Sequence, residues 1–251
     1  RLRAFASRIH IMIFDTRPLR TIRSFVRRES RMTASQKCAL KELWPRYGVG
    51  IGAEPLDFDA VFGRQAPVIL EIGFGNGDAL RASAMANPQN NYLGIEVHRP
   101  GIGTLLRNLE ASGIENVRVM HADAMEVLKT TIPDDSLAAV RLFFPDPWPK
   151  KRHHKRRLVQ TEFVELVRRK LKPGGYLHLA TDWEEYAGHM WAVLSGTAGL
   201  SAVTDPERQA AMTGARPLTK FEQRGRRLGH KVGELVYRRT AGLLSSQCNG
   251  L

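Results

Sequence analysis

The chain has 251 residues, of which 43% are hydrophobic and 25% are charged, as is ordinary for a folded globular protein. Its 38 Lys and Arg residues outnumber its 25 Asp and Glu residues, and the net charge of +13 predicts a polyanionic partner, either nucleic acid or an anionic membrane surface. No apolar run approaches the ~20 residues of a membrane-spanning helix, so we expect no membrane-embedded segment. The two cysteines, Cys38 and Cys248, lie too far apart for a zinc-ligand spacing and predict reduced thiols in a cytoplasmic protein.

Residues 1–36 predict a basic and flexible arm. Residues 22–28 interleave bulky apolar side chains with arginines, which suits phosphate contact with some base stacking, although a solvated tail is an equal alternative. The arginine-rich, acid-poor composition of residues 1–31 is also typical of an organelle transit peptide. We expect one folded domain over residues 37–240, followed by a flexible tail over residues 241–251.

From residue 68 onward, short apolar runs alternate with segments of helical periodicity. The predicted strands lie at residues 68–72, 92–97, 117–120, 138–144, 176–180, 200–203 and 235–237. The predicted helices lie at residues 78–86, 102–111, 125–129, 158–171 and 183–194. This α/β alternation predicts a doubly wound, mostly parallel sheet of about seven strands with helices on both faces. Ligands bind such sheets at the carboxyl ends of the strands, so functional residues should directly follow them.

The first predicted strand runs into a glycine-rich loop. Gly73, Gly75 and Gly77 follow the pattern G-x-G-x-G, which permits a tight turn and the close approach of backbone to a ligand. This spacing differs from the G-x-G-x-x-G of dinucleotide-binding dehydrogenases. Glu71 lies inside the apolar strand, where a carboxylate costs several kcal/mol unless it is paired. A cationic ligand such as S-adenosylmethionine, which carries an ammonium and a sulfonium, suits that position.

Two further acids stand at predicted strand ends. Glu96 follows the glycine loop by about 20 residues, the position from which a carboxylate accepts hydrogen bonds from ribose hydroxyls. Asp123 ends the third strand and could accept a hydrogen bond from an adenine amino group. Either acid alone could be an ordinary strand-end cap. Together with Glu71 they favour S-adenosylmethionine over a nicotinamide cofactor, whose pyrophosphate would be repelled by three carboxylates.

The fourth predicted strand leads into the sequence F-P-D-P-W-P-K over residues 144–150. Each proline fixes its own φ and disfavours the helical region for the residue before it, namely Phe144, Asp146 and Trp148. We expect a stiff, extended loop that holds Asp146 where a reacting base would lie. A rigid structural turn is the alternative, and the Asp-Pro-Trp sequence is also similar to loops of methyltransferases that act on exocyclic amines.

These motifs, with K-R-H-H-K-R-R at residues 151–157, Thr181-Asp182 and R-P-L-T-K-F-E at residues 216–222, resemble the bacterial-type tRNA (guanine-N7-)-methyltransferases. The resemblance covers about residues 21–240, and its most specific motif is P-D-P-W-P-K followed by the basic run. It implies a Rossmann-like class I methyltransferase fold. It also implies methyl transfer from S-adenosylmethionine to N7 of guanine 46 in the variable loop of tRNA.

The resemblance also implies roles for the matching residues. The cofactor would be bound by Glu71, Gly73, Gly75, Gly77, Glu96, Asp123 and Asp146, with Asp146 also at the catalytic centre. The substrate would be held by Lys150, Asp182, Thr219, Lys220, Phe221 and Glu222. The basic run would contact RNA phosphates through Arg152, His153, His154, Lys155, Arg156 and Arg157. We expect no metal, because adjacent histidines diverge and have no partners at ligand spacing.

The chemistry of guanine suits this set of residues. N7 has a lone pair and no proton, so no general base is needed, and Asp146 is expected to stabilise the positive charge that develops on the purine. Asp182 or Glu222 matches the two donors of guanine's Watson–Crick edge, and Trp148 or Phe221 could stack on an extruded base. Methylation of an exocyclic amine and a non-catalytic RNA-binding module remain alternatives. A monomer and a homodimer are equally compatible with the sequence.

Overall fold

The computed structural model describes residues 31–214, 222 and 231–240. Its strands form one sheet in the order β3-β2-β1-β4-β5-β7-β6. The strands are β1 (Val68–Ile72), β2 (Asn91–Glu96), β3 (Val117–His121), β4 (Leu137–Phe143), β5 (Leu171–Thr181), β6 (Leu200–Ala202) and β7 (Gly233–Arg239). β1 to β5 are mutually parallel, whereas β7 runs antiparallel between β5 and β6. The predicted doubly wound, mostly parallel sheet is therefore confirmed.

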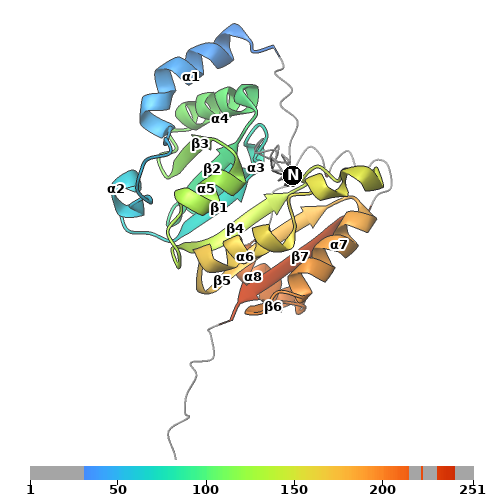
Figure 1. The fold of residues 1–251 in the computed structure, drawn as a ribbon. Helices are drawn as coiled ribbons and strands as arrows, with labels where there is room; N and C mark the ends of the chain where they lie inside the picture. The colour runs from blue at the N-terminus through green and yellow to red at the C-terminus, as the bar shows by residue number, and fades with distance from the viewer. Residues whose placement is uncertain (1–30, 215–221, 223–230, 241–251) are drawn as a thin grey trace, which may run out of the picture.

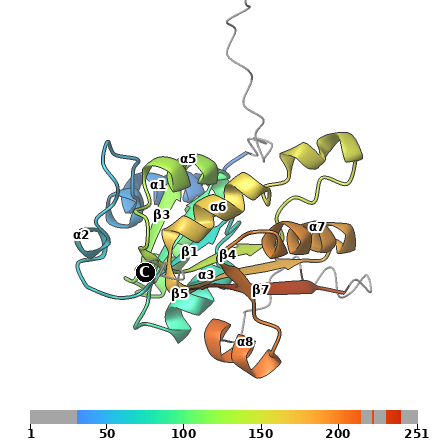
Figure 2. The same ribbon diagram turned by 60° about the horizontal axis from the view of Figure 1, so that its bottom comes forward.

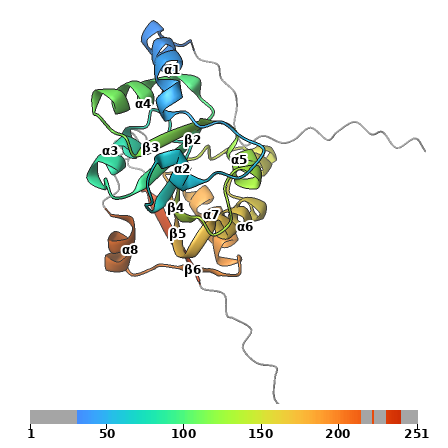
Figure 3. The same cartoon turned by 90° about the vertical axis from the view of Figure 1, so that its left-hand side faces the viewer.

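Helices cover both faces of the sheet (Figures 1 and 3). They are α1 (Ala34–Tyr47), α2 (Phe58–Phe62), α3 (Asp78–Ala86), α4 (Arg99–Ala111), α5 (Ala124–Thr130), α6 (Thr161–Lys170), α7 (Glu184–Ser195) and α8 (Pro206–Thr213), with a 3₁₀ helix η1 (Lys151–Arg156). Figure 3 shows α3, α4 and α8 on one side of the sheet and α5, α6 and α7 on the other, with α1 lying against α4.

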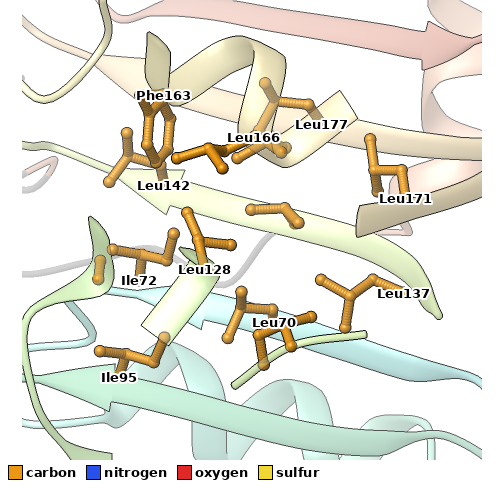
Figure 4. Packing of buried hydrophobic residues seen from close by; sticks show 14 of the residues in the cluster. Leu70, Ile72, Ile95, Leu128, Leu137, Leu142, Phe163, Leu166, Leu171 and Leu177 are labelled. Carbon is orange, nitrogen blue, oxygen red and sulfur yellow. The ribbon is translucent and has the colours of Figure 1, made fainter. Parts of the chain in front are cut away.

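Two apolar layers enclose the sheet, one on each face. Alternate residues of the strands point to opposite faces, so Leu70 and Ile72 of β1 join one buried cluster while Ile69 joins the other. The first cluster includes Leu128 of α5 and Phe163 of α6, as Figure 4 shows. A slip of one residue would turn each strand's buried set toward the wrong layer, so the two layers fix the register. That register aligns the carboxyl ends of the parallel strands at one edge.

The first described helix, α1, was not predicted. Thr33 caps it, because its side chain accepts from the backbone N–H of Gln36 while the Gln36 side chain accepts from the backbone N–H of Thr33. This capping box is a signal that the sequence carries. Since α1 begins at Ala34, it starts before the arm boundary placed at residue 36, and the division into arm, domain and tail stays a prediction. None of the described helices is both long and apolar enough to cross a membrane.

Other elements also differ from the sequence expectation. β5 begins at Leu171, five residues before the predicted strand, and its pairing with β4 shifts register between Leu137 and Ala139. Pro173 lies in this irregular stretch and cannot donate to the ladder, so regular pairing resumes only at Tyr176. The helix α8 was also missed, although it has the sequence signals of an Asp205 cap and a proline in its first turn.

Candidate active site

The acids predicted to form one site follow neighbouring strands. Glu71 lies in β1, Glu96 is the last residue of β2, and Asp123 caps α5 directly after β3. Since β1, β2 and β3 are adjacent and parallel, their carboxyl ends meet at one edge of the sheet. The structure thus brings the three acids to the same edge.

The glycine loop after β1 is a tight turn with an open outer surface. Gly73, Gly75 and Gly77 have φ values of 71°, 59° and 78°, a left-handed region that side chains disfavour. A Cβ on Gly73 or Gly75 would meet no atom within 4 Å, so the backbone there is accessible to a ligand. On the inner side, a Cβ on Gly101 would lie 2.1 Å from the Gly75 carbonyl oxygen, which shows how closely α4 packs against the loop.

The Glu96 carboxylate ties this loop to the end of β2. One oxygen accepts from the Gly75 N–H at 2.8 Å, and the other accepts from the N–H groups of Val97 and His98 at 2.7 and 2.9 Å. A carboxylate has about four acceptor sites, so roughly one remains for a ligand hydroxyl. The structure therefore leaves less acceptor capacity at Glu96 than the two ribose hydrogen bonds expected from the sequence.

Glu71 is a buried carboxylate whose hydrogen-bonding capacity and charge are only partly satisfied by the protein. Only 3% of the residue is exposed, and among the described residues its Oε2 atom has no hydrogen-bond partner. Burial raises the pKa of this carboxyl to about 7, against the opposing effect of Arg141, its neighbour on β4. The Arg141 guanidinium donates instead to Ser83 Oγ at 2.9 Å and to the Thr213 carbonyl. A buried carboxylate with an unpartnered oxygen and a raised pKa would be stabilised by a cationic ligand.

The proline-rich loop after β4 is held in a strained conformation. Phe144 and Trp148 have φ values of 51° and 47°. Both residues leave the right-handed helical region, as predicted, but the expectation of an extended loop is wrong because they adopt the left-handed region. Such residues cost on the order of 1–3 kcal/mol each and persist where their surroundings fix them. Here the Phe144 N–H donates to the Ala180 carbonyl at 2.8 Å and Arg157 Nε donates to the Pro147 carbonyl at 2.9 Å.

Comparison with known proteins identifies the family. A family model described as "Putative methyltransferase" matches residues 65–235. The tRNA (guanine-N(7)-)-methyltransferase of Nitrosococcus oceani is 58% identical over 227 residues, which cover 90% of this chain and 93% of that protein. The enzyme of the same name from Alkalilimnicola ehrlichii is 59% identical over 222 residues, covering 88% and 93%. The chain belongs to the tRNA (guanine-N(7)-)-methyltransferase family.

Solved structures agree on the fold of this methyltransferase. The 16S rRNA methyltransferase KamB aligns with a TM-score of 0.50 at 16% identity, over 75% of this chain and 95% of that one. Similarity at this identity shows the fold alone. It confirms the Rossmann-like class I methyltransferase fold that the sequence predicts.

The predicted catalytic and substrate residues follow the next strands of the same sheet. Asp146 is exposed on the loop after β4, which lies beside β1, and Asp182 is half-buried directly after β5. Both therefore stand at the edge that holds Glu71, Glu96 and Asp123. Glu222 is buried. The remaining substrate residues predicted from the resemblance, Thr219, Lys220 and Phe221, lie outside the described residues, as does the basic stretch 22–28.

The basic run divides into exposed and buried members. Lys150, Lys151, Arg152 and Lys155 are exposed on or beside η1. His153 and His154 are half-buried, and the pKa of the His153 imidazole is lowered, mainly by desolvation and further by the cations around it. Within the described chain, no group of three or more His, Cys, Asp or Glu side chains is arranged to hold a metal.

Trp148 packs against η1 rather than standing open on both faces. The Arg156 guanidinium lies 5.0 Å from the centre of its ring, and the His153 ring meets it edge-on at 5.8 Å. These contacts cover part of the indole, so stacking on a base would have to use the remaining surface. Arg157 is buried, which the sequence expectation of a phosphate contact did not foresee.

One residue of the site escaped the sequence analysis altogether. Arg141 is buried in β4 with 5% exposure, next to Glu71 in the register of the sheet. Its guanidinium also lies 5.8 Å from the centre of the Tyr92 ring. A cation inside an apolar strand was the available signal, because such a residue requires a compensating partner.

Proposed function

We propose that this chain transfers a methyl group from S-adenosylmethionine to N7 of guanine 46 in the variable loop of tRNA. Relatives that are 58% and 59% identical over about nine tenths of the chain bear the name of this enzyme. The geometric observation that carries the proposal is Asp146, held on a strained loop beside the acid-lined glycine turn. We further propose that the enzyme is cytoplasmic and acts as a monomer or a homodimer.

The residues at the edge of the sheet fit the cofactor. The remaining acceptor site of Glu96 would take a ribose hydroxyl. Asp123 uses Oδ1 to accept from the Met125 N–H at 2.9 Å, which leaves Oδ2 for the adenine amino group. Glu71 would face the cationic methionine part. When bound, S-adenosylmethionine supplies a methyl group activated by its sulfonium.

The protein contributes position and charge. Guanine N7 carries a lone pair and no proton, so the chain does not have to remove one. The stiff loop holds Asp146 with little ordering entropy left to lose, and a fixed carboxylate stabilises the positive charge that develops on the purine. Asp146 is therefore assigned an electrostatic role and not that of a base.

Recognition of guanine calls for a carboxylate at its Watson–Crick edge. Guanine offers two adjacent donors there, N1–H and the N2 amino group, whereas adenine does not. Asp182 follows β5 at the correct edge of the sheet, and Glu222 is the second candidate. The exposed cations of η1, with Lys150, would contact the phosphates that flank the extruded base.

Methyl transfer from labelled S-adenosylmethionine to unmodified bulk tRNA tests the proposal. We expect label in N7-methylguanosine, recognised by its alkali-labile cationic base, and no label after replacement of the variable-loop guanine. Label in an exocyclic amine would establish the alternative methyltransferase activity. Cofactor binding without transfer to any RNA would exclude tRNA as the acceptor.

A further inference from the structure

Arg157 differs from every other cation of the basic run that contains it. It is 2% exposed, whereas Lys151, Arg152 and Lys155 point into solvent. A buried guanidinium is tolerated only where hydrogen bonds and opposite charge replace its water. A side chain that has found such partners within the protein is not available to a phosphate on the surface.

The partners of Arg157 come from three separate segments. Its Nε donates to the carbonyl oxygen of Pro147 at 2.9 Å, and its Nη2 donates to Glu185 Oε1 of α7 at 3.2 Å. The same Nη2 lies 3.1 Å from Nε2 of His154 in η1. The guanidinium also stands 4.9 Å from the centre of the buried Tyr186 ring. Arg157 thus joins the proline-rich loop that carries Asp146, the helix η1 and the helix α7.

The hydrogen bond to Pro147 controls the backbone next to Asp146. The proline ring fixes φ of Pro147, so the remaining freedom at this point lies in its ψ and in φ of Trp148. Both angles rotate the peptide plane whose oxygen Arg157 holds. Trp148 has a φ of 47°, and the bond from Arg157 is therefore a direct restraint on a strained residue two positions from Asp146.

The other side of Arg157 rests on a rigid base. Tyr186 is fully buried, and its hydroxyl oxygen accepts from the Val159 N–H at 3.3 Å. One turn further along α7, His189 donates to the Val159 carbonyl at 2.8 Å. Figure 2 shows α6 and α7 side by side on one face of the sheet. The segment between β4 and α6 is therefore fastened to α7 just after Arg157.

We propose that Arg157 is a positioning residue, which holds the Asp146 loop in its reactive conformation and couples it to the phosphate-contacting helix η1. This inference rests on the proposed function. It assigns to Arg157 a role in turnover and removes it from the set of RNA ligands expected from the sequence. Lysine would not replace it, because a single ammonium cannot supply the planar fork that reaches Pro147 and Glu185 together.

The test compares Arg157→Ala and Arg157→Lys with Arg152→Ala, which removes an exposed arginine of the same basic run. For each variant, kcat and the salt dependence of tRNA binding are measured. We expect Arg157→Ala to lower kcat by roughly 100-fold, as misplaced catalytic groups do, while the salt slope stays that of the wild type. Arg152→Ala should lower the slope by about one, because it removes an exposed phosphate contact, and this change in slope is the pattern that Arg157→Ala should not show.

Hydrogen exchange of residues 144–150 gives a readout that needs no activity. We expect faster exchange in both Arg157 variants and unchanged exchange in Arg152→Ala. An Arg157→Ala protein with normal kcat, or with a salt slope lowered by about one, overturns the inference. If this variant does not fold, Arg157→Lys decides the same question. Failure of the wild type to methylate tRNA would refute the proposed function. The hydrogen-exchange rates would still show whether Arg157 restrains residues 144–150.

Discussion

At the scale of single residues, we expect the buried Glu71 carboxyl to make the binding of S-adenosylmethionine dependent on pH. Burial raises the pKa of this carboxyl to about 7 in the free protein. A cationic ligand favours its ionised form, so binding should release a proton and strengthen as pH rises through 7. The stability of the free protein changes in the opposite direction. The native state holds the Glu71 proton more tightly than the unfolded chain does, so stability falls as pH rises from the ordinary carboxyl pKa to about 7.

We expect the affinity for S-adenosylmethionine to increase about tenfold from pH 6 to pH 8, because the ionised fraction of Glu71 changes by that factor. Glu71→Gln should bind more weakly at pH 8 and lose this pH dependence. Calorimetric titration in two buffers of different ionisation enthalpy measures both the affinity and the proton release. A wild-type affinity that is flat across this range would place the cofactor's charge away from Glu71.

Asp146 is the second residue for which charge and position can be separated. Asp146→Asn keeps the shape of the side chain and removes its charge, so we expect turnover to fall by roughly 100-fold or more. Binding of the cofactor should remain largely intact, because Glu71, Glu96 and Asp123 are unchanged. Single-turnover methylation and cofactor titration measure the two effects. Unchanged turnover would remove Asp146 from the mechanism.

At the scale of secondary structure, patterns local in sequence were predicted well. The helix expected at residues 78–86 is α3, and the apolar run at residues 68–72 is β1. The acids at successive strand ends also meet at one edge, because parallel neighbours place their carboxyl ends together. Each of these features depends on periodicity or on strand order, which the sequence carries.

Features that depend on distant contacts were not predicted. The left-handed conformation of Trp148 stands beside a bond from Arg157 to the Pro147 carbonyl, and proline chemistry alone reveals neither of them. The burial of Arg157 depends on α7, which follows in the chain by more than 25 residues. Within a run of seven basic residues, nothing local distinguishes the one that lies under the loop from those that face solvent.

The capping box of α1 can be tested directly. Thr33→Ala removes the acceptor for the Gln36 N–H, and we expect the free energy of unfolding to fall by about 1 kcal/mol. Thr33→Ser keeps the hydroxyl and should stay close to the wild type. Urea unfolding measures the free energy of unfolding of both variants. Equal stability of the two variants would mean that the packing of α1 on α4 holds the helix without its cap.

At the scale of the whole molecule, a group of exposed cations lies close to the carboxyl edge of the sheet. Lys151, Arg152 and Lys155 are exposed on η1, which follows the Asp146 loop directly. Phosphates gripped there would lie near the site of methyl transfer. Because each neutralised phosphate releases counterions, affinity should fall linearly on a logarithmic scale as salt increases.

Removing these three cations should therefore change the salt slope of tRNA binding as well as the affinity itself. We expect Lys151→Ala, Arg152→Ala and Lys155→Ala together to lower the slope by about two to three, since each phosphate contact contributes roughly 0.7 to 0.9. Lys129→Ala is the matched control, because Lys129 is an exposed cation in the last turn of α5, paired with Glu162 and away from the carboxyl edge of the sheet. Filter binding at a series of salt concentrations gives the slopes. If the triple variant and the control change the slope equally, the net charge of the molecule attracts tRNA without a defined contact at η1. A change in slope confined to the triple variant would place the phosphate backbone of tRNA beside Asp146.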